Sequence, residues 1–132
     1  MEVRGAGDVA TAVRAGTRAG IGAIIVLSGP ELGQAATHKQ IADFAAKNGL
    51  PSISLFRAFS NAGGLMSYGH VPGFFGPRAG MLIGKILNGT NPGDLAIELA
   101  SKFELVINLK TAKALGIIIP QPLRLRADEL IE

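Results

Sequence analysis

"KFELVINLKTAKALGI", residues 102–117, joins a strand pattern directly to a helix pattern. Side chains alternate in character from Lys102 to Ile107, as they do in a β-strand. Asn108 is placed to cap a short helix that reaches Leu115, and Gly116 then ends it. A strand must pair with other strands, so the rest of the chain has to supply a sheet.

The first sixty residues supply strands and helices in alternation. An apolar run at 23–27 and a strand pattern at 51–56 are each preceded by a helix pattern, at 8–19 and 37–47. This order is typical of βαβ units, which build parallel sheets. The unbroken apolar run predicts that strand 23–27 is central and buried on both faces, with strand 51–56 parallel beside it. We therefore predict an α/β fold with an open, mostly parallel sheet flanked by helices, as in Rossmann-like proteins.

The second half of the chain is less regular. The patterns predict a short strand at 65–68, a helix at 76–87, an extended segment at 97–99 and a last helix at 123–131. Clusters of glycine, asparagine and proline separate these elements, and neither an internal repeat nor a linker is visible.

Composition excludes several classes of protein. The 132 residues are 48% hydrophobic and 17% charged, which is typical of a globular domain. There is no cysteine, hence no disulfide, thiolate metal site or cysteine nucleophile. The 13 Lys and Arg are scattered and offset by 10 acids, which argues against nucleic-acid binding. Residues 1–20 lack a signal-peptide pattern, and the apolar runs are too short to span a membrane.

No residue forms a convincing catalytic or metal site. Ser28 follows a strand, but the glycine that a nucleophile elbow needs two residues earlier is absent. His38 and His70 are far apart and lack a carboxylate pattern, so no metal is predicted, and His38 is expected in solvent. The glycines at 16, 20 and 22 precede a strand, whereas a dinucleotide fingerprint follows one. No cofactor is predicted.

Ligands of open parallel sheets bind beyond the carboxyl ends of the strands. Here those ends are residues 28–30, 57–59 and 67–70, which nominates these loops as the binding edge. Tyr68, the only tyrosine, could stack on a ligand or pack on its own lobe. Arg57 could bind a carboxylate or be a surface charge.

Six segments carry a resemblance to a known family, and two of them are GAIIVLSGP (22–30) and HKQIADFAAKNGLPSISLFRAF (38–59). AGGLMSYG (62–69), KILNGTNPGDL (85–95), residues 102–117 and ADELIE (127–132) resemble the C-terminal part of the ABC-transporter substrate-binding proteins of the uncharacterized tryptophan- or tyrosine-type transport system. The resemblance implies a type I periplasmic-binding-protein fold, with two α/β lobes and the ligand between them. Residues 1–60 and 102–132 would belong to the second lobe, with strand 102–107 at its sheet edge. Residues 65–99 would complete the first lobe.

The resemblance also implies a function. Members bind small ligands, in some cases aromatic amino acids, and deliver them to an ABC permease from the periplasm or from a membrane-anchored extracellular position. They are not enzymes. The family's cleft, carried onto this chain, would be contacted by Ser28, Gly29, Arg57, Phe59, Ser67, Tyr68 and Gly69.

Two alternatives remain open. One is a free-standing ligand-sensing domain of the same fold. The other is a small α/β hydrolase or transferase, which would need an acid or base at a strand end, and the three loops carry no carboxylate. For the isolated chain, the apolar face of helix 76–87 needs a cover. We therefore predict that it forms a symmetric homodimer and binds amino acids weakly or not at all.

Overall fold

The computed structural model describes residues 6–29, 32, 34–71, 73, 75–97, 99 and 101–132. The chain divides into two compact units. Unit 1 consists of Met1–Gly69 and Glu104–Glu132, and unit 2 consists of His70–Phe103.

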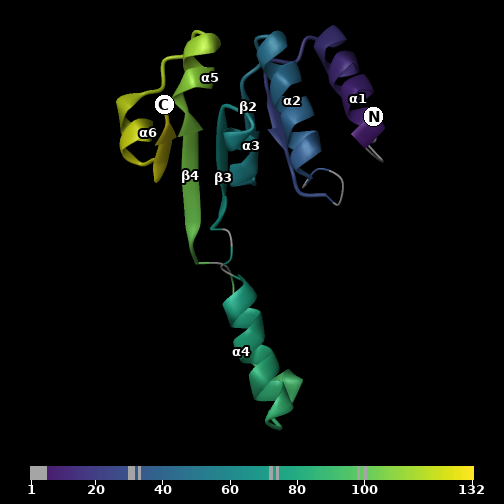
Figure 1. Ribbon diagram of the computed structural model, residues 1–132, viewed down its shortest axis with the longest axis vertical. Helices are drawn as coiled ribbons and strands as arrows, with labels where there is room; N and C mark the ends of the chain where they lie inside the picture. Colours follow the sequence, from purple (N-terminus) through teal and green to yellow (C-terminus); the bar gives the residue numbers. More distant parts are fainter. Residues whose placement is uncertain are drawn as a thin grey trace. The chain divides into compact units, whose positions relative to one another are not determined.

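The sheet has five strands, and their order in space is their order in the chain (Figure 1). The parallel pairs are β1 with β2, β2 with β3 and β4 with β5. The backbone N–H of Asn108 donates to the Leu65 carbonyl (2.8 Å) and that of Val71 donates to the Lys102 carbonyl (3.3 Å), so β3 and β4 run antiparallel. The predicted open, mostly parallel α/β sheet is therefore confirmed. The strands are β1 (Ile24–Val26), β2 (Ser52–Ser54), β3 (Met66–His70), β4 (Phe103–Asn108) and β5 (Glu129–Ile131).

Helices cover the two faces of this sheet unequally. On the first face, Val26, Ser54 and Ser67 lie side by side in register. This face is covered by α1 (Ala6–Arg18), α2 (Ala35–Lys47) and α3 (Arg57–Asn61), and α1 lies beside α2 (Figure 1). The core of this face consists of Val9, Val26, Ile41, Ala42 and Phe59.

The second face carries the row Ile25, Ile53 and Met66, again in register. It is covered toward β4 and β5 by α5 (Leu109–Ala114) and α6 (Gln121–Leu125). The core there contains Leu65, Ile107, Ala112 and Ile119, with Met66, Leu123 and Leu130 packed against it. Near β1 the second face is uncovered, and the Ile25 side chain is therefore 71% exposed.

The expected position of strand 23–27 is wrong. Among the described residues, β1 is the outermost strand, and Ile25 is exposed rather than buried. Its parallel pairing with β2 is correct, with Ile24 opposite Ser52. The apolar run is typical of an inner strand, but in this chain neither a neighbouring strand nor a helix covers the outer side of β1 within the described residues.

The expected edge position of strand 102–107 is also wrong. β5 lies outside β4, with Leu130 opposite Ile107. The predicted helix 123–131 is therefore only partly correct, because α6 ends at Leu125 and residues 129–131 form β5. The cap at Asn108 is confirmed, since its side chain accepts a hydrogen bond from the Thr111 N–H at 3.0 Å.

Two other boundaries differ from expectation. Residues 65–69 lie in the sheet of unit 1, because β3 pairs with β2 and neighbours β4. The strand therefore has no unpaired edge. The expected loop at 57–59 is the start of α3. Ile97 and Leu99 lie outside any strand, and Glu98 lies outside the described residues.

Unit 2 is built around α4 (Phe75–Leu87), followed by a 3₁₀ turn at Pro92–Asp94. None of the described side chains of α4 is buried. The His70 ring packs edge-on against Phe75, with 4.9 Å between the ring centres. Across the described part of the chain, every helix is too short or too polar to cross a bilayer.

Candidate functional site at the carboxyl edge of the sheet

The register of the parallel strands brings the three predicted loops to one edge of unit 1. Val26, Ser54 and Ser67 are level with one another. One residue further, Leu27, Leu55 and Tyr68 come level on the second face, and we call these three side chains the edge row. All three are exposed, Leu27 at 62% and Tyr68 at 52%. The edge of the sheet therefore presents an apolar and aromatic surface.

The seven predicted contact residues divide by exposure. Ser28 and Tyr68 are exposed, and Gly29 and Arg57 are half-buried. The remaining three are buried: Phe59, Ser67 and Gly69. The buried residues shape the edge from behind, and only the first four present surface to a ligand in this structure.

Each of the three buried residues has a structural role. Phe59 belongs to the core of the first face, and its ring fills the space that a side chain at Gly64 would need. A Cβ on Gly69 would come within 1.9 Å of the Leu55 carbonyl oxygen, so only glycine allows β3 to approach β2 this closely. The Ser67 hydroxyl is buried and has no hydrogen-bond partner among the described residues.

Arg57 is held by two carboxylates that the sequence did not nominate. Its Nη1 donates to Glu104 Oε2 at 3.1 Å, and its Nη2 donates to Glu129 Oε2. Because β4 is antiparallel to β3, the start of β4 reaches the edge where β1 to β3 end. The three loops themselves carry no carboxylate, as expected, but β4 and β5 bring Glu104 and Glu129 to the same edge. The signal lay in the alternation of residues 103–108, which places Glu104 on the inward face with Val106.

One carboxylate oxygen of Glu104 is buried and unpaired among the described residues. The Glu104 side chain is only 12% exposed, and the unpaired atom is Oε1. Arg57 and Glu104 place both signs of charge at the same edge of the sheet, but on the first face, whereas the edge row lies on the second face. Such an edge suits a small ligand that has an apolar body and charged groups.

His38 is buried, so the expectation that it is solvated is wrong. Helix α2 begins at Ala35, so position 38 falls on the same helical face as Ile41, Ala42 and Ala45. The His38 ring lies 5.3 Å from the Phe56 ring and 6.0 Å from the Phe59 ring, centre to centre. Burial lowers the pKa of His38 below its ordinary 6.5, and the Leu32 backbone opposes this only in part.

The acidic and histidine side chains do not gather into a metal site. Within the described ranges, no three His, Cys, Asp or Glu side chains lie close enough together to hold an ion. The polar groups at the edge include the Arg57 ion pairs, the Ser28 and Tyr68 hydroxyls and backbone groups.

The family model for ABC transporter substrate-binding proteins matches residues 1–131. The chain belongs to this family. A comparison with curated proteins gives no match.

Solved structures share the fold. A conserved domain protein from Vibrio cholerae is 25% identical with a TM-score of 0.85, covering 97% of this chain and 42% of that one. An ABC domain from Streptococcus pneumoniae, solved in complex with L-Trp, is 24% identical with a TM-score of 0.80, covering 98% and 44%. A ligand-free, open substrate-binding protein from Clostridium difficile is 19% identical with a TM-score of 0.66, covering 98% and 42%. This ABC substrate-binding chain thus spans less than half the length of each relative.

Proposed function

We propose that this chain is part of the solute-binding component of an ABC importer. It holds a small ligand, an amino acid with an aromatic side chain, at the carboxyl edge of its sheet. The observation that carries the proposal is that the edge row and the Arg57–Glu104 ion pair lie at one edge of the sheet, in a chain of the substrate-binding family. The structural relative in complex with L-Trp supports the ligand class. The partner in this proposal is an ABC permease, which the binding protein contacts on the extracellular side of the membrane.

Each exposed group at the edge has a role in this proposal. Tyr68 stacks on the apolar body of the ligand, and Ser28 and the Gly29 backbone offer hydrogen bonds. Arg57, which is half-buried, faces the ligand carboxylate. Unit 1 acts as one lobe, residues 70–99 contribute to the other lobe, and closure of the two lobes on the ligand is what the permease recognises. The role is binding, without a catalytic step.

The replacement Tyr68→Ala tests the site. In the complete binding protein, we expect the affinity for L-Trp, L-Tyr or L-Phe to fall about tenfold, because a stacked aromatic pair is worth roughly 0.5–1.5 kcal/mol beyond its buried area. The melting temperature should change little, because Tyr68 is half exposed. Titration calorimetry measures the affinity.

Tyr68→Phe is the matched control. It keeps the ring and removes the hydroxyl, so it should retain most of the affinity if stacking dominates. Equal affinities for the native protein and Tyr68→Ala would remove Tyr68 from the site. No binding of any of the three amino acids by the native protein would reject the ligand class.

We also propose that the isolated chain self-associates through α4. Ile83, Ile86 and Leu87 follow the spacing of one helical face, and all three are exposed. Apolar patches of several hundred Å² are rare on monomers, and a two-fold axis would let two copies cover each other. Light scattering should therefore give about twice the monomer mass, with little binding of amino acids by the isolated chain.

The double replacement Ile83→Glu/Leu87→Glu should return the chain to a monomer, because it places charges on the face that would be covered. Matched replacements at Ile118 and Leu125, which are exposed on unit 1, should leave the dimer intact. A native chain that stays monomeric at high micromolar concentration would contradict this proposal.

A further inference from the structure

We propose that Glu129 competes with the carboxylate of the ligand for Arg57, an inference that rests on the proposed function. A bound amino acid displaces the Glu129 carboxylate from Arg57 Nη2, while the ion pair between Arg57 and Glu104 persists. Glu129 therefore lowers the affinity of the site for every ligand that has a carboxylate, and has no such effect on a ligand without one.

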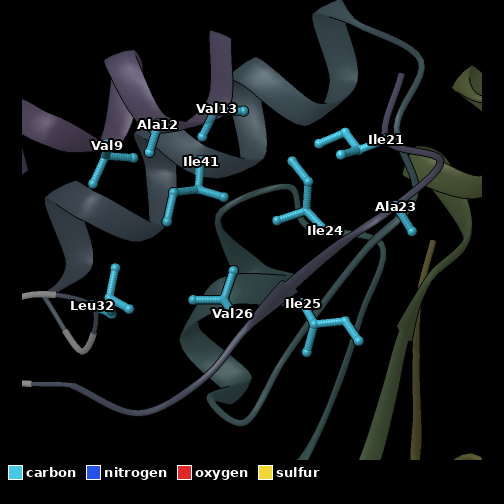
Figure 2. Close-up of a pocket in the computed structure, with 10 residues that line it drawn as sticks. All are labelled: Val9, Ala12, Val13, Ile21, Ala23, Ile24, Ile25, Val26, Leu32 and Ile41. Atoms are coloured by element: carbon cyan, nitrogen blue, oxygen red, sulfur yellow. The ribbon is translucent and has the colours of Figure 1, made fainter. Parts of the chain in front are cut away.

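Arg57 is the cation that the carboxyl edge offers to a ligand. It is the only lysine or arginine in the three loops of this edge, residues 28–30, 57–59 and 67–70. A hollow of about 300 Å³ between α1, α2 and β1 is not an alternative place for a carboxylate, because all 10 residues that Figure 2 labels around it are apolar. A ligand carboxylate at these loops therefore has Arg57 as its charged partner.

The guanidinium group of Arg57 is already occupied from two other strands. Arg57 follows β2 in the chain, whereas Glu104 lies on β4 and Glu129 lies on β5, and β3 separates β2 from β4. The backbone hydrogen bonds between the antiparallel strands β3 and β4 put Gly69 opposite Glu104. Gly69 has no side chain, so it leaves room over β3 for the ion pairs. A ligand that reaches Arg57 therefore meets a cation that already has two anionic partners.

The two anionic partners differ in burial. The Glu104 side chain is 12% exposed, its Oε2 accepts from Arg57 Nη1 at 3.1 Å, and its Oε1 has no partner among the described residues. Without Arg57, Glu104 would be a buried charge with no counter-ion there, which is a costly state. The Glu129 side chain is 38% exposed and lies on the outermost strand beside β4, so it can turn to water. Glu129 is therefore the carboxylate that a ligand displaces.

The charges around Arg57 favour an exchange of carboxylates over the addition of a third. One guanidinium and two carboxylates leave this cluster with an excess of negative charge. A ligand carboxylate that bound beside both glutamates would increase the excess, and like charges a few Å apart repel each other. If Glu129 turns to water as the ligand binds, the charge around Arg57 stays as it was. The measured affinity is then the difference between the ion pair gained and the ion pair lost.

The replacement Glu129→Gln tests the competition, because it keeps the shape of the side chain and removes its charge. In the complete binding protein it should raise the affinity for L-Trp about tenfold in titration calorimetry. The affinity for L-tryptophanamide, which keeps the indole ring and the ammonium group but lacks the carboxylate, should not rise. Arg57→Gln should weaken L-Trp binding, and adding Glu129→Gln to it should then change the affinity less than about twofold, since the competition is already gone.

Glu132→Gln is the matched control, because Glu132 is exposed just beyond β5 and the ion pairs of Arg57 within the described residues are with Glu104 and Glu129. It should leave the affinity for L-Trp unchanged. The competition is overturned if Glu129→Gln does not raise this affinity, if L-tryptophanamide gains equally, or if Glu132→Gln gives the same gain. Failure of the native protein to bind L-Trp, L-Tyr or L-Phe would instead reject the proposed function, and the competition with it.

Discussion

Replacing Phe59 with alanine should lower the free energy of unfolding of the chain by about 3–5 kcal/mol. Phe59 is fully buried, and it joins α3 to Val26 of β1 and to Ile41 and Ala42 of α2. The change removes these contacts and leaves a cavity beside Gly64 that the backbone cannot fill. Urea unfolding followed by circular dichroism measures the loss.

The control for this prediction is Leu125→Ala. Leu125 is exposed on unit 1, so its truncation should change the stability by less than about 0.5 kcal/mol. A Phe59→Ala chain that unfolds at the same urea concentration as the native chain would contradict this prediction.

The stability of the chain should fall as the pH is lowered below about 6.5, because of His38. Burial holds the pKa of His38 below its usual 6.5 in the folded state. Below that pH the unfolded chain binds a proton that the folded chain does not bind, so each pH unit costs up to about 1.4 kcal/mol until the lowered folded pKa is reached. Above pH 6.5, His38 is neutral in both the folded and the unfolded chain, so it no longer makes the stability depend on pH. Denaturant unfolding between pH 5 and pH 8 measures the slope.

Two replacements isolate the imidazole. His38→Leu and His38→Gln both remove the titration, so both should flatten this part of the pH profile. His38→Leu should also raise stability at pH 7.5 by about 1 kcal/mol, because neither ring nitrogen of His38 has a hydrogen-bond partner among the described residues. A pH profile unchanged in both variants would exclude His38 as the source.

The local patterns predicted the elements well, but they could not predict which strands lie at the sheet edges. Helix spacing, the Asn108 cap and the turn clusters act over a few residues, so they can be read from one segment. Whether β1 lies inside the sheet or at its edge depends on which other strands are present. Its apolar run indicates only that the strand is suited to an inner position. The three residues of β5 were hidden because DELIE fits a helix as easily as a strand.

The candidate site was predictable in its place but only partly in its residues. Strand ends indicate which loops meet, and Ser28, Arg57 and Tyr68 all lie at that edge. Exposure depends on packing from distant segments, which explains why Phe59 and Ser67 are buried. Glu104 was missed because its contribution requires an antiparallel strand, and the direction of β4 is fixed by the return from unit 2.

The two ends of unit 2 lie side by side, since the Val71 N–H donates to the Lys102 carbonyl. The intervening chain is therefore a closed loop between two neighbouring strands. Loop-closure entropy depends only on the logarithm of loop length, and each doubling costs about 0.6 kcal/mol. Insertions or deletions in this segment would thus change the stability of the sheet very little. Residues between Val71 and Lys102 are free to diverge in length and sequence under selection for what they contact, while the sheet keeps its register.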